Sequence, residues 1–187
     1  MRLWALWLSL ASLAFSTPLS TRTTSSSEPP TATLISSNAH NKTVFVGRTL
    51  FEFNQDLFLG VKFADEPVRF TPAKLKAKYA SSDSDSGAYD LSAAGIESHA
   101  SEVYYNATEY GYDCPGYGSD TTNLVNQGFV TLNENCLNLN VIRPQSDSKE
   151  LLPVLLWIFG GGWQQGSTAD PRSVRTHHCG CFKLMCG

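Results

Sequence analysis

The sequence has no apolar run long enough to cross a bilayer and no excess of positive charge. The longest N-terminal apolar stretch, Leu3–Phe15, is shorter than the roughly 20 residues that a membrane-spanning helix needs. The formal net charge is -3, and the only basic cluster is one short run of lysines, Lys74, Lys76 and Lys78. Because nucleic-acid binders carry a clustered basic face, we expect no nucleic-acid partner and no membrane span.

The N-terminus has the pattern of a secretory signal. Arg2 precedes the apolar stretch, and Ala14 and Ser16 supply the small residues that a signal peptidase reads, so we expect a signal peptide over residues 1–16. Residues 17–33 are rich in Ser, Thr and Pro and predict a flexible leader. Behind a signal peptide, Asn41 and Asn106 become expected N-glycosylation sites, and the chain is expected to be secreted.

The five cysteines fall into two groups. Cys114 and Cys136 lie in ordinary sequence and are expected to form a disulfide, which for a loop of this length is worth roughly 3 kcal/mol. The other three lie beside two histidines in residues 172–187, a tail that we interpret as stray sequence from a retained intron or a frameshift, with a Zn or Cu site as the alternative. Their spacing fits no standard structural zinc pattern, so we predict no metal site and no cofactor.

The middle of the chain predicts short strands and loops. Strands are expected at residues 43–46 and 56–63, which are rich in β-branched, aromatic and aliphatic side chains. Residues 81–87 predict an exposed loop, in which Asp83 and Asp85 are solvated rather than paired for catalysis. Residues 93–105 have weak helical spacing, and residues 110–128 are rich in loop-forming side chains.

Two further strands lead into a glycine run. Residues 136–142 alternate apolar and polar side chains, which predicts a half-buried strand. Residues 153–159 are continuously apolar, which predicts a strand buried on both faces. Gly160-Gly161-Gly162 follows directly, and the carboxyl end of a buried strand is a common place for ligand chemistry.

The glycine run is compatible with several sites. A phosphate-binding loop would need a lysine before Ser167, and none is present. A dinucleotide fingerprint would need a third glycine at position 165, where the chain has Gln165. An oxyanion loop, whose amide N–H groups bind an acyl oxygen, fits the residues, and so does a plain tight turn.

The surroundings of the glycine run favour the oxyanion loop, because five segments resemble the type-B carboxylesterases and lipases in order. The segments are Phe58-Leu59-Gly60-Val61-Lys62-Phe63-Ala64, Glu66-Pro67-Val68-Arg69-Phe70, Cys114-Pro115, Asn133-Glu134-Asn135-Cys136-Leu137-Asn138-Leu139-Asn140-Val141, and Leu152 to Trp163 with Gln165-Gly166-Ser167. The resemblance covers residues 34–171. It implies an α/β fold, the N-terminal part of an α/β-hydrolase fold with the first strands of its central sheet, incomplete in this chain.

The resemblance also implies roles for individual residues. Gly161 and Gly162 would supply oxyanion donors, Cys114 and Cys136 the disulfide, and Arg69 would form a salt bridge with Glu134. A buried pair of that kind is costly to break from one side. The implied substrate is a small-molecule or lipid ester.

The chain also departs from the family pattern. Phe159 replaces the usual His or Tyr, and Lys62 stands where the family has Pro. No serine has glycine two residues away on both sides, so the nucleophile elbow is absent, and with it the acid and histidine that follow. We therefore expect a secreted carboxylic ester hydrolase truncated before its serine and inactive as given. The alternatives are a non-catalytic secreted binding protein of the same family and a non-functional truncated gene product.

Overall fold

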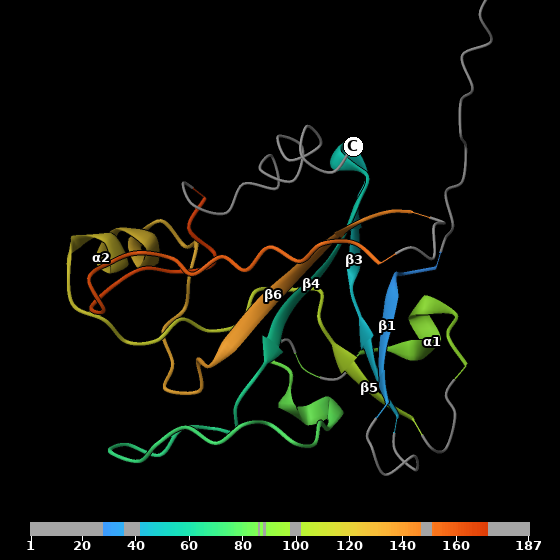
Figure 1. Cartoon of the computed structure of the whole chain (residues 1–187), viewed down its shortest axis with the longest axis horizontal. Coiled ribbons are helices and arrows are strands. Elements are labelled where there is room, and N and C mark those ends of the chain that lie inside the picture. Colours follow the sequence, from blue (N-terminus) through green and yellow to red (C-terminus); the bar gives the residue numbers. More distant parts are fainter. Residues whose placement is uncertain are drawn as a thin grey trace, which may run out of the picture.

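The computed structural model describes residues 28–35, 42–85, 87, 89–97, 102–146 and 151–171. The predicted signal peptide (1–16), most of the predicted leader, Asn41 and the tail at 172–187 lie outside these ranges. Within them the chain forms two three-stranded sheets, short helices and long connecting loops (Figure 1).

The first sheet has the order β1-β2-β5. Strands β1 (Thr31–Ile35) and β2 (Lys42–Val46) are antiparallel, and β2 is parallel to β5 (Glu102–Asn106). After Thr43, strand β2 contains only apolar residues, and Val44, Phe45 and Val46 are all buried. The prediction of a strand at residues 43–46 is confirmed.

The second sheet has the order β3-β4-β6, antiparallel throughout. Its strands are β3 (Arg48–Leu50), β4 (Gln55–Lys62) and β6 (Asn138–Pro144), and the 3-10 helix η1 (Phe51–Phe53) links the first two. The register of β4 against β6 shifts between Phe58 and Val61. Gly60 lies in this bulge with a left-handed φ of 66°, which glycine adopts without steric cost.

Tyr105 joins the two sheets. It is fully buried, its hydroxyl donates to the Gly60 carbonyl at 3.0 Å, and it accepts from the Lys62 amide at 3.3 Å. Its ring packs on Phe45 and Tyr79 with centroids 5.1 and 5.7 Å away. Burial raises the pKa of the Tyr105 phenol, so the hydroxyl stays a donor. Strand β4 is thereby fixed over β5.

The weak helical spacing over residues 93–105 corresponds to a helix only at its start. Helix α1 covers only Leu91–Ala94: Asp90 caps its start by accepting from Ser92, and Gly95 ends it with a φ of 70°. The β-branched and aromatic residues that follow pair with β2 as strand β5. The predicted loop over residues 110–128 is partly wrong, since helix α2 (Ser119–Asn126) lies inside it and buries Thr121 and Leu124.

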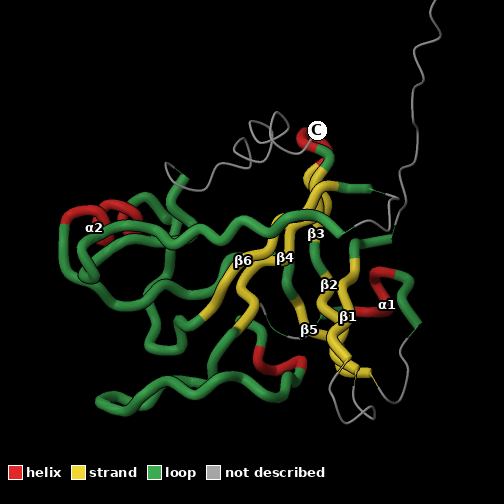
Figure 2. Tube along the Cα trace, in the orientation of Figure 1, coloured by secondary structure: helices red, strands yellow, loops and turns green. Residues whose placement is uncertain are grey.

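The predicted buried strand at residues 153–159 is also wrong. This segment forms no strand and runs as a loop in Figure 2. Val154 is 95% exposed and Leu156 is 79% exposed. The apolar run has the composition of a central strand, but no strand among the described residues pairs with it. The predicted strands at residues 56–63 and 136–142 correspond to β4 and β6 and are confirmed.

Candidate active site

The glycine loop, residues 160–166, is a closed turn. The Gly161 carbonyl accepts from the amides of Gln164 at 3.2 Å and Gln165 at 3.3 Å. Gly161 has a φ of 136° and Gly162 a φ of 63°, and a Cβ atom at Gly161 would overlap the Gln165 carbonyl. Only glycine fits at position 161, because any side chain would open the turn.

The amide nitrogens of Gly161 and Gly162 donate no hydrogen bond to any atom in the described part of the chain. The loop borders a cavity of about 550 Å³, lined also by the Cys114–Cys136 disulfide and by Tyr112, Asp113 and Phe159. That volume is in the range of small-molecule pockets. Two unpaired donors at such a cavity can bind an anionic or carbonyl oxygen of a ligand.

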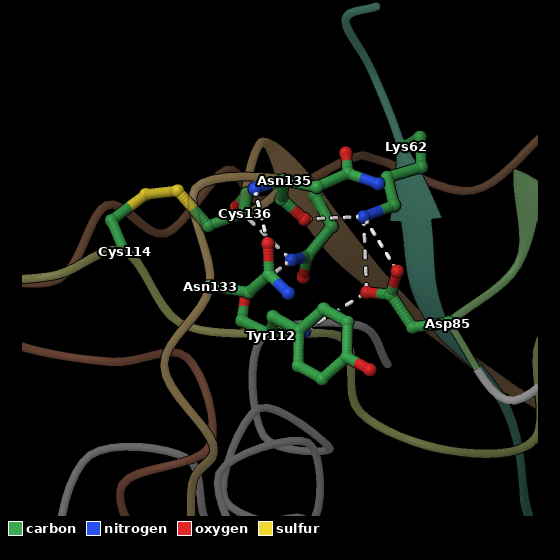
Figure 3. The surroundings of a disulfide bond; sticks show 8 residues. Lys62, Asp85, Tyr112, Cys114, Asn133, Asn135 and Cys136 are labelled. Atoms are coloured by element: carbon green, nitrogen blue, oxygen red, sulfur yellow. Dashed lines mark hydrogen bonds and ion pairs between the residues drawn. A yellow bond between two sulfur atoms is a disulfide. The ribbon is translucent and has the colours of Figure 1, made fainter. Parts of the chain in front are cut away.

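The disulfide forms a second part of the cavity wall, beside the glycine loop. Cys114 and Cys136 are bonded, with their Cα atoms 4.9 Å apart and a sequence separation of 22 (Figure 3). The Asn138 amide group, just beyond Cys136, donates to the Tyr112 carbonyl at 2.8 Å. The two chain segments that the disulfide joins are therefore held together by more than the covalent bond.

A buried ion pair supports this wall, and the sequence analysis missed it. The Lys62 ammonium lies 2.8 Å from the Asp85 carboxylate and donates to the Asn135 carbonyl at 2.5 Å. The Lys62 side chain is 2% exposed and that of Asp85 is 9% exposed. Asp85 also accepts from the Tyr112 amide at 3.0 Å, as Figure 3 shows.

The prediction that Asp85 is solvated in an exposed loop is thus wrong. The 3-10 helix η2 (Ser81–Asp83) precedes it and turns the chain inward, so that Asp85 meets Lys62. The available signal was Lys62 itself, the one charged residue among the apolar residues 57–63, since a buried ammonium requires a partner.

The salt bridge between Arg69 and Glu134 forms, but at the surface. The Arg69 guanidinium donates to the Glu134 carboxylate, and the two side chains are 73% and 50% exposed. The hydrogen bond and charge of Glu134 raise the pKa of the Arg69 guanidinium. The expectation of a buried pair is wrong, because the loop that carries Arg69 has no covering segment among the described residues. Water screens such a pair, and it contributes little to stability.

Asp113 places a carboxyl group beside the glycine loop. It lines the cavity, and its side chain is hydrogen-bonded to Ser167, which directly follows Gly166 and is 2% exposed. Burial raises the pKa of the Asp113 carboxyl, and the hydrogen bond with Ser167 opposes that rise. No pattern in the sequence singles out this pair.

The remaining predicted sites lie away from the cavity. Asn106 ends β5, is half-buried, and its side-chain oxygen accepts from the amide and hydroxyl of Thr108 at 3.2 and 2.9 Å. The residues that the structure describes contain no group of three or more His, Cys, Asp or Glu side chains that could hold a metal ion. In the same ranges, every helix is too short or too polar to cross a membrane.

Comparison with known proteins gives consistent matches over most of the chain. The model of the family described as "Carboxylesterase family" matches residues 91–177. Lipase 1 of Geotrichum candidum is 31% identical over 125 residues, which are 65% of this chain and 22% of that protein. The "Secreted triacylglycerol lipase LIP1" of Gibberella zeae is 32% identical over 118 residues, 61% of this chain and 19% of that protein.

A solved structure of a thermophilic PNB esterase is 25% identical and superposes with a TM-score of 0.49, covering 74% of this chain and 23% of that one. The chain therefore spans about a fifth of the length of the curated relatives that it matches.

Proposed function

Since this chain belongs to the carboxylesterase family, we propose that it supplies the oxyanion loop of a secreted carboxylic ester hydrolase whose serine nucleophile lies outside these 187 residues. The membership carries the α/β-hydrolase fold with it, as the resemblance implied. The observation that supports the role most directly is that Gly161 and Gly162, whose amides are unpaired, line a cavity beside the disulfide.

The chemistry follows from those two amides. A serine that attacks an ester carbonyl turns the carbonyl oxygen into an oxyanion, and preorganised N–H donors stabilise the charge as it develops. Gly161 and Gly162 would donate to this oxygen. The 187 residues contain no Gly-x-Ser-x-Gly segment, so the charge that these donors stabilise is not generated by this polypeptide itself.

The substrate class is a small-molecule or lipid ester. Phe159 and the disulfide give the cavity apolar walls, which suit an acyl chain. Relatives named as lipases, one of them a secreted triacylglycerol lipase, support the same class. The N-terminal signal pattern and the disulfide between Cys114 and Cys136 support secretion, because disulfides persist in oxidising compartments.

Two products from the same gene test the proposal. The transcript is sequenced across the codons for Asp170 and beyond. Any product that continues into Gly-x-Ser-x-Gly is expressed in a secreting host, and its hydrolysis of p-nitrophenyl butyrate is measured. We expect that longer product to hydrolyse the ester and the purified 187-residue chain to show no turnover.

Variants of the longer product test the role of the loop. Gly161→Ala keeps the amide but opens the turn, because its Cβ would overlap the Gln165 carbonyl, so it should displace the donors and lower kcat by about a hundredfold, the scale of losing one oxyanion donor. Gly128→Ala is the control, since Gly128 also has a left-handed φ, 73°, but does not line the cavity. Ester turnover that copurifies with the 187-residue chain, or a longer product without esterase activity, would refute the proposal.

A further inference from the structure

Gln165 connects the glycine loop to helix α2, 45 positions away in sequence. Its side-chain oxygen accepts from the backbone amide of Asp120 at 3.3 Å. The preceding residue, Gln164, makes a second contact: its carbonyl accepts from the Tyr117 amide at 2.7 Å. Two hydrogen bonds thus join the glycine loop to the segment at the start of α2.

Helix α2 needs that contact. The residue at its N-cap is Gly118, which has no side chain to accept from the first amides of the helix. Those amides are left without intrahelical partners, and an N-cap side chain normally accepts from one of them. Gln165 performs this function from another part of the chain, on the amide of the second helical residue.

The close approach requires glycine at the contact. A Cβ atom at Gly118 would overlap the Gln165 side-chain oxygen, and one at Gly116 would lie 2.6 Å from the Gln164 carbonyl. A Cβ at Gly161 would overlap the Gln165 carbonyl from the other side. Gln165 is therefore packed between the helix start and the glycine that carries a candidate oxyanion donor.

From these contacts we infer that Gln165 is a positioning residue, which fixes the Gly161 and Gly162 amides by capping α2 with its side chain. The inference rests on the proposed function, because it concerns the same loop. The disulfide loop of Cys114 and Cys136 contains α2, so the cap joins the glycine loop to a covalently closed segment.

Amide hydrogen exchange of the 187-residue chain, read by mass spectrometry, tests the inference. Gln165→Met keeps the length of the side chain and removes the accepting oxygen. We expect about fivefold faster exchange in two places, the first turn of α2 and the amides of Gln164 and Gln165, which the Gly161 carbonyl holds in the glycine loop. This is the change that loss of a typical cap produces. Gln165→Glu restores an accepting oxygen and should exchange as wild type does.

The neighbouring glutamine is the matched control. The Gln164 side chain is exposed, and only its backbone makes the contact with Tyr117, so Gln164→Met should leave both segments unchanged. Strands β2 and β4 are followed in the same samples to separate a local effect from global unfolding.

Four results would overturn the inference. They are unchanged exchange in Gln165→Met, faster exchange in α2 alone, equal effects of both Met variants, and faster exchange spread equally over β2 and β4. Because the measurement uses no ester, it stands apart from the test of the proposed function. Failure of one does not imply failure of the other.

Discussion

At the scale of single residues, the wall of the cavity depends on charges that the sequence pattern did not pair. Lys62 and Asp85 are 23 positions apart and meet only because η2 turns the chain toward β4. Asp113 and Ser167 meet only because the glycine loop folds back on the disulfide. Contacts of this kind depend on tertiary structure, and the spacing of residues along the chain carries no signal for them.

Removing one partner of the buried ion pair should be costly. Lys62→Met leaves the Asp85 carboxylate buried without its cation, which we expect to lower the free energy of unfolding by about 3–5 kcal/mol. Urea denaturation followed by tyrosine and tryptophan fluorescence measures the change. Lys42→Met is the control: its ion pair with Glu102 spans 3.7 Å and its side chain is 48% exposed, so the loss should be below about 1 kcal/mol. Equal losses in the two variants would contradict the assignment.

The Asp113 carboxyl should make stability depend on pH. Burial raises its pKa in the folded chain above the ordinary value of 3.8, so the folded state keeps the proton to a higher pH than the unfolded state does. Its contribution is therefore fully present below that ordinary value and is lost as pH rises through the folded pKa. Asp113→Asn should abolish this loss, measured as unfolding free energy against pH.

Asp90 provides a comparison of opposite sign. Hydrogen bonds from Ser92 and Ala93 lower the pKa of its carboxyl, so its contribution is present above 3.8 and is lost as pH falls. Asp90→Asn should therefore flatten the acid side of the same stability profile. A profile in which Asp113→Asn and Asp90→Asn act in the same direction would contradict one of the two assignments, and the side of the profile that changes would show which.

At the scale of elements, the sequence predicted those strands whose apolar side chains are covered by neighbours close at hand. Strands β2 and β4 were predicted correctly, because their side chains pack into one core around Tyr105. Helix α2 was missed, because its apolar content is low and Gln165, far away in sequence, accepts from its first turn. For residues 153–159 the error was the opposite, a strand predicted where none forms. The composition of this segment suits a central strand, but the structure leaves it unpaired.

That exposed segment should make the chain associate. Residues 154–159 form a six-residue window without charge or proline, rich in aliphatic and aromatic side chains, which is typical of aggregation-prone sequence. Leu156→Glu should raise the monomer fraction in light scattering after size-exclusion chromatography. Leu75→Glu is the control, since Leu75 is 81% exposed but lies outside the segment. A wild-type chain that is fully monomeric, with a sharp cooperative melt, would contradict this prediction.

At the scale of the whole molecule, the family and the position of the glycine loop could be predicted from the sequence, because they rest on several short motifs in a fixed order. The surroundings of the loop could not. Arg69 and Glu134 are exposed, and Gln165 caps α2, because of how distant segments pack against one another. That packing depends on the tertiary structure and has no signal in a short motif.

The central claim is that residues 160–166 form a working oxyanion loop, and a transplant tests it most directly. Residues 159–167 of this chain replace the matching residues of Geotrichum candidum Lipase 1, and ester hydrolysis is measured beside the melting temperature. The account predicts a kcat within about tenfold of the parent lipase, and a further fall of about a hundredfold when the transplanted loop carries Gly161→Ala. A transplant that melts like the parent, yet is as inactive as its Gly161→Ala version, would contradict the claim.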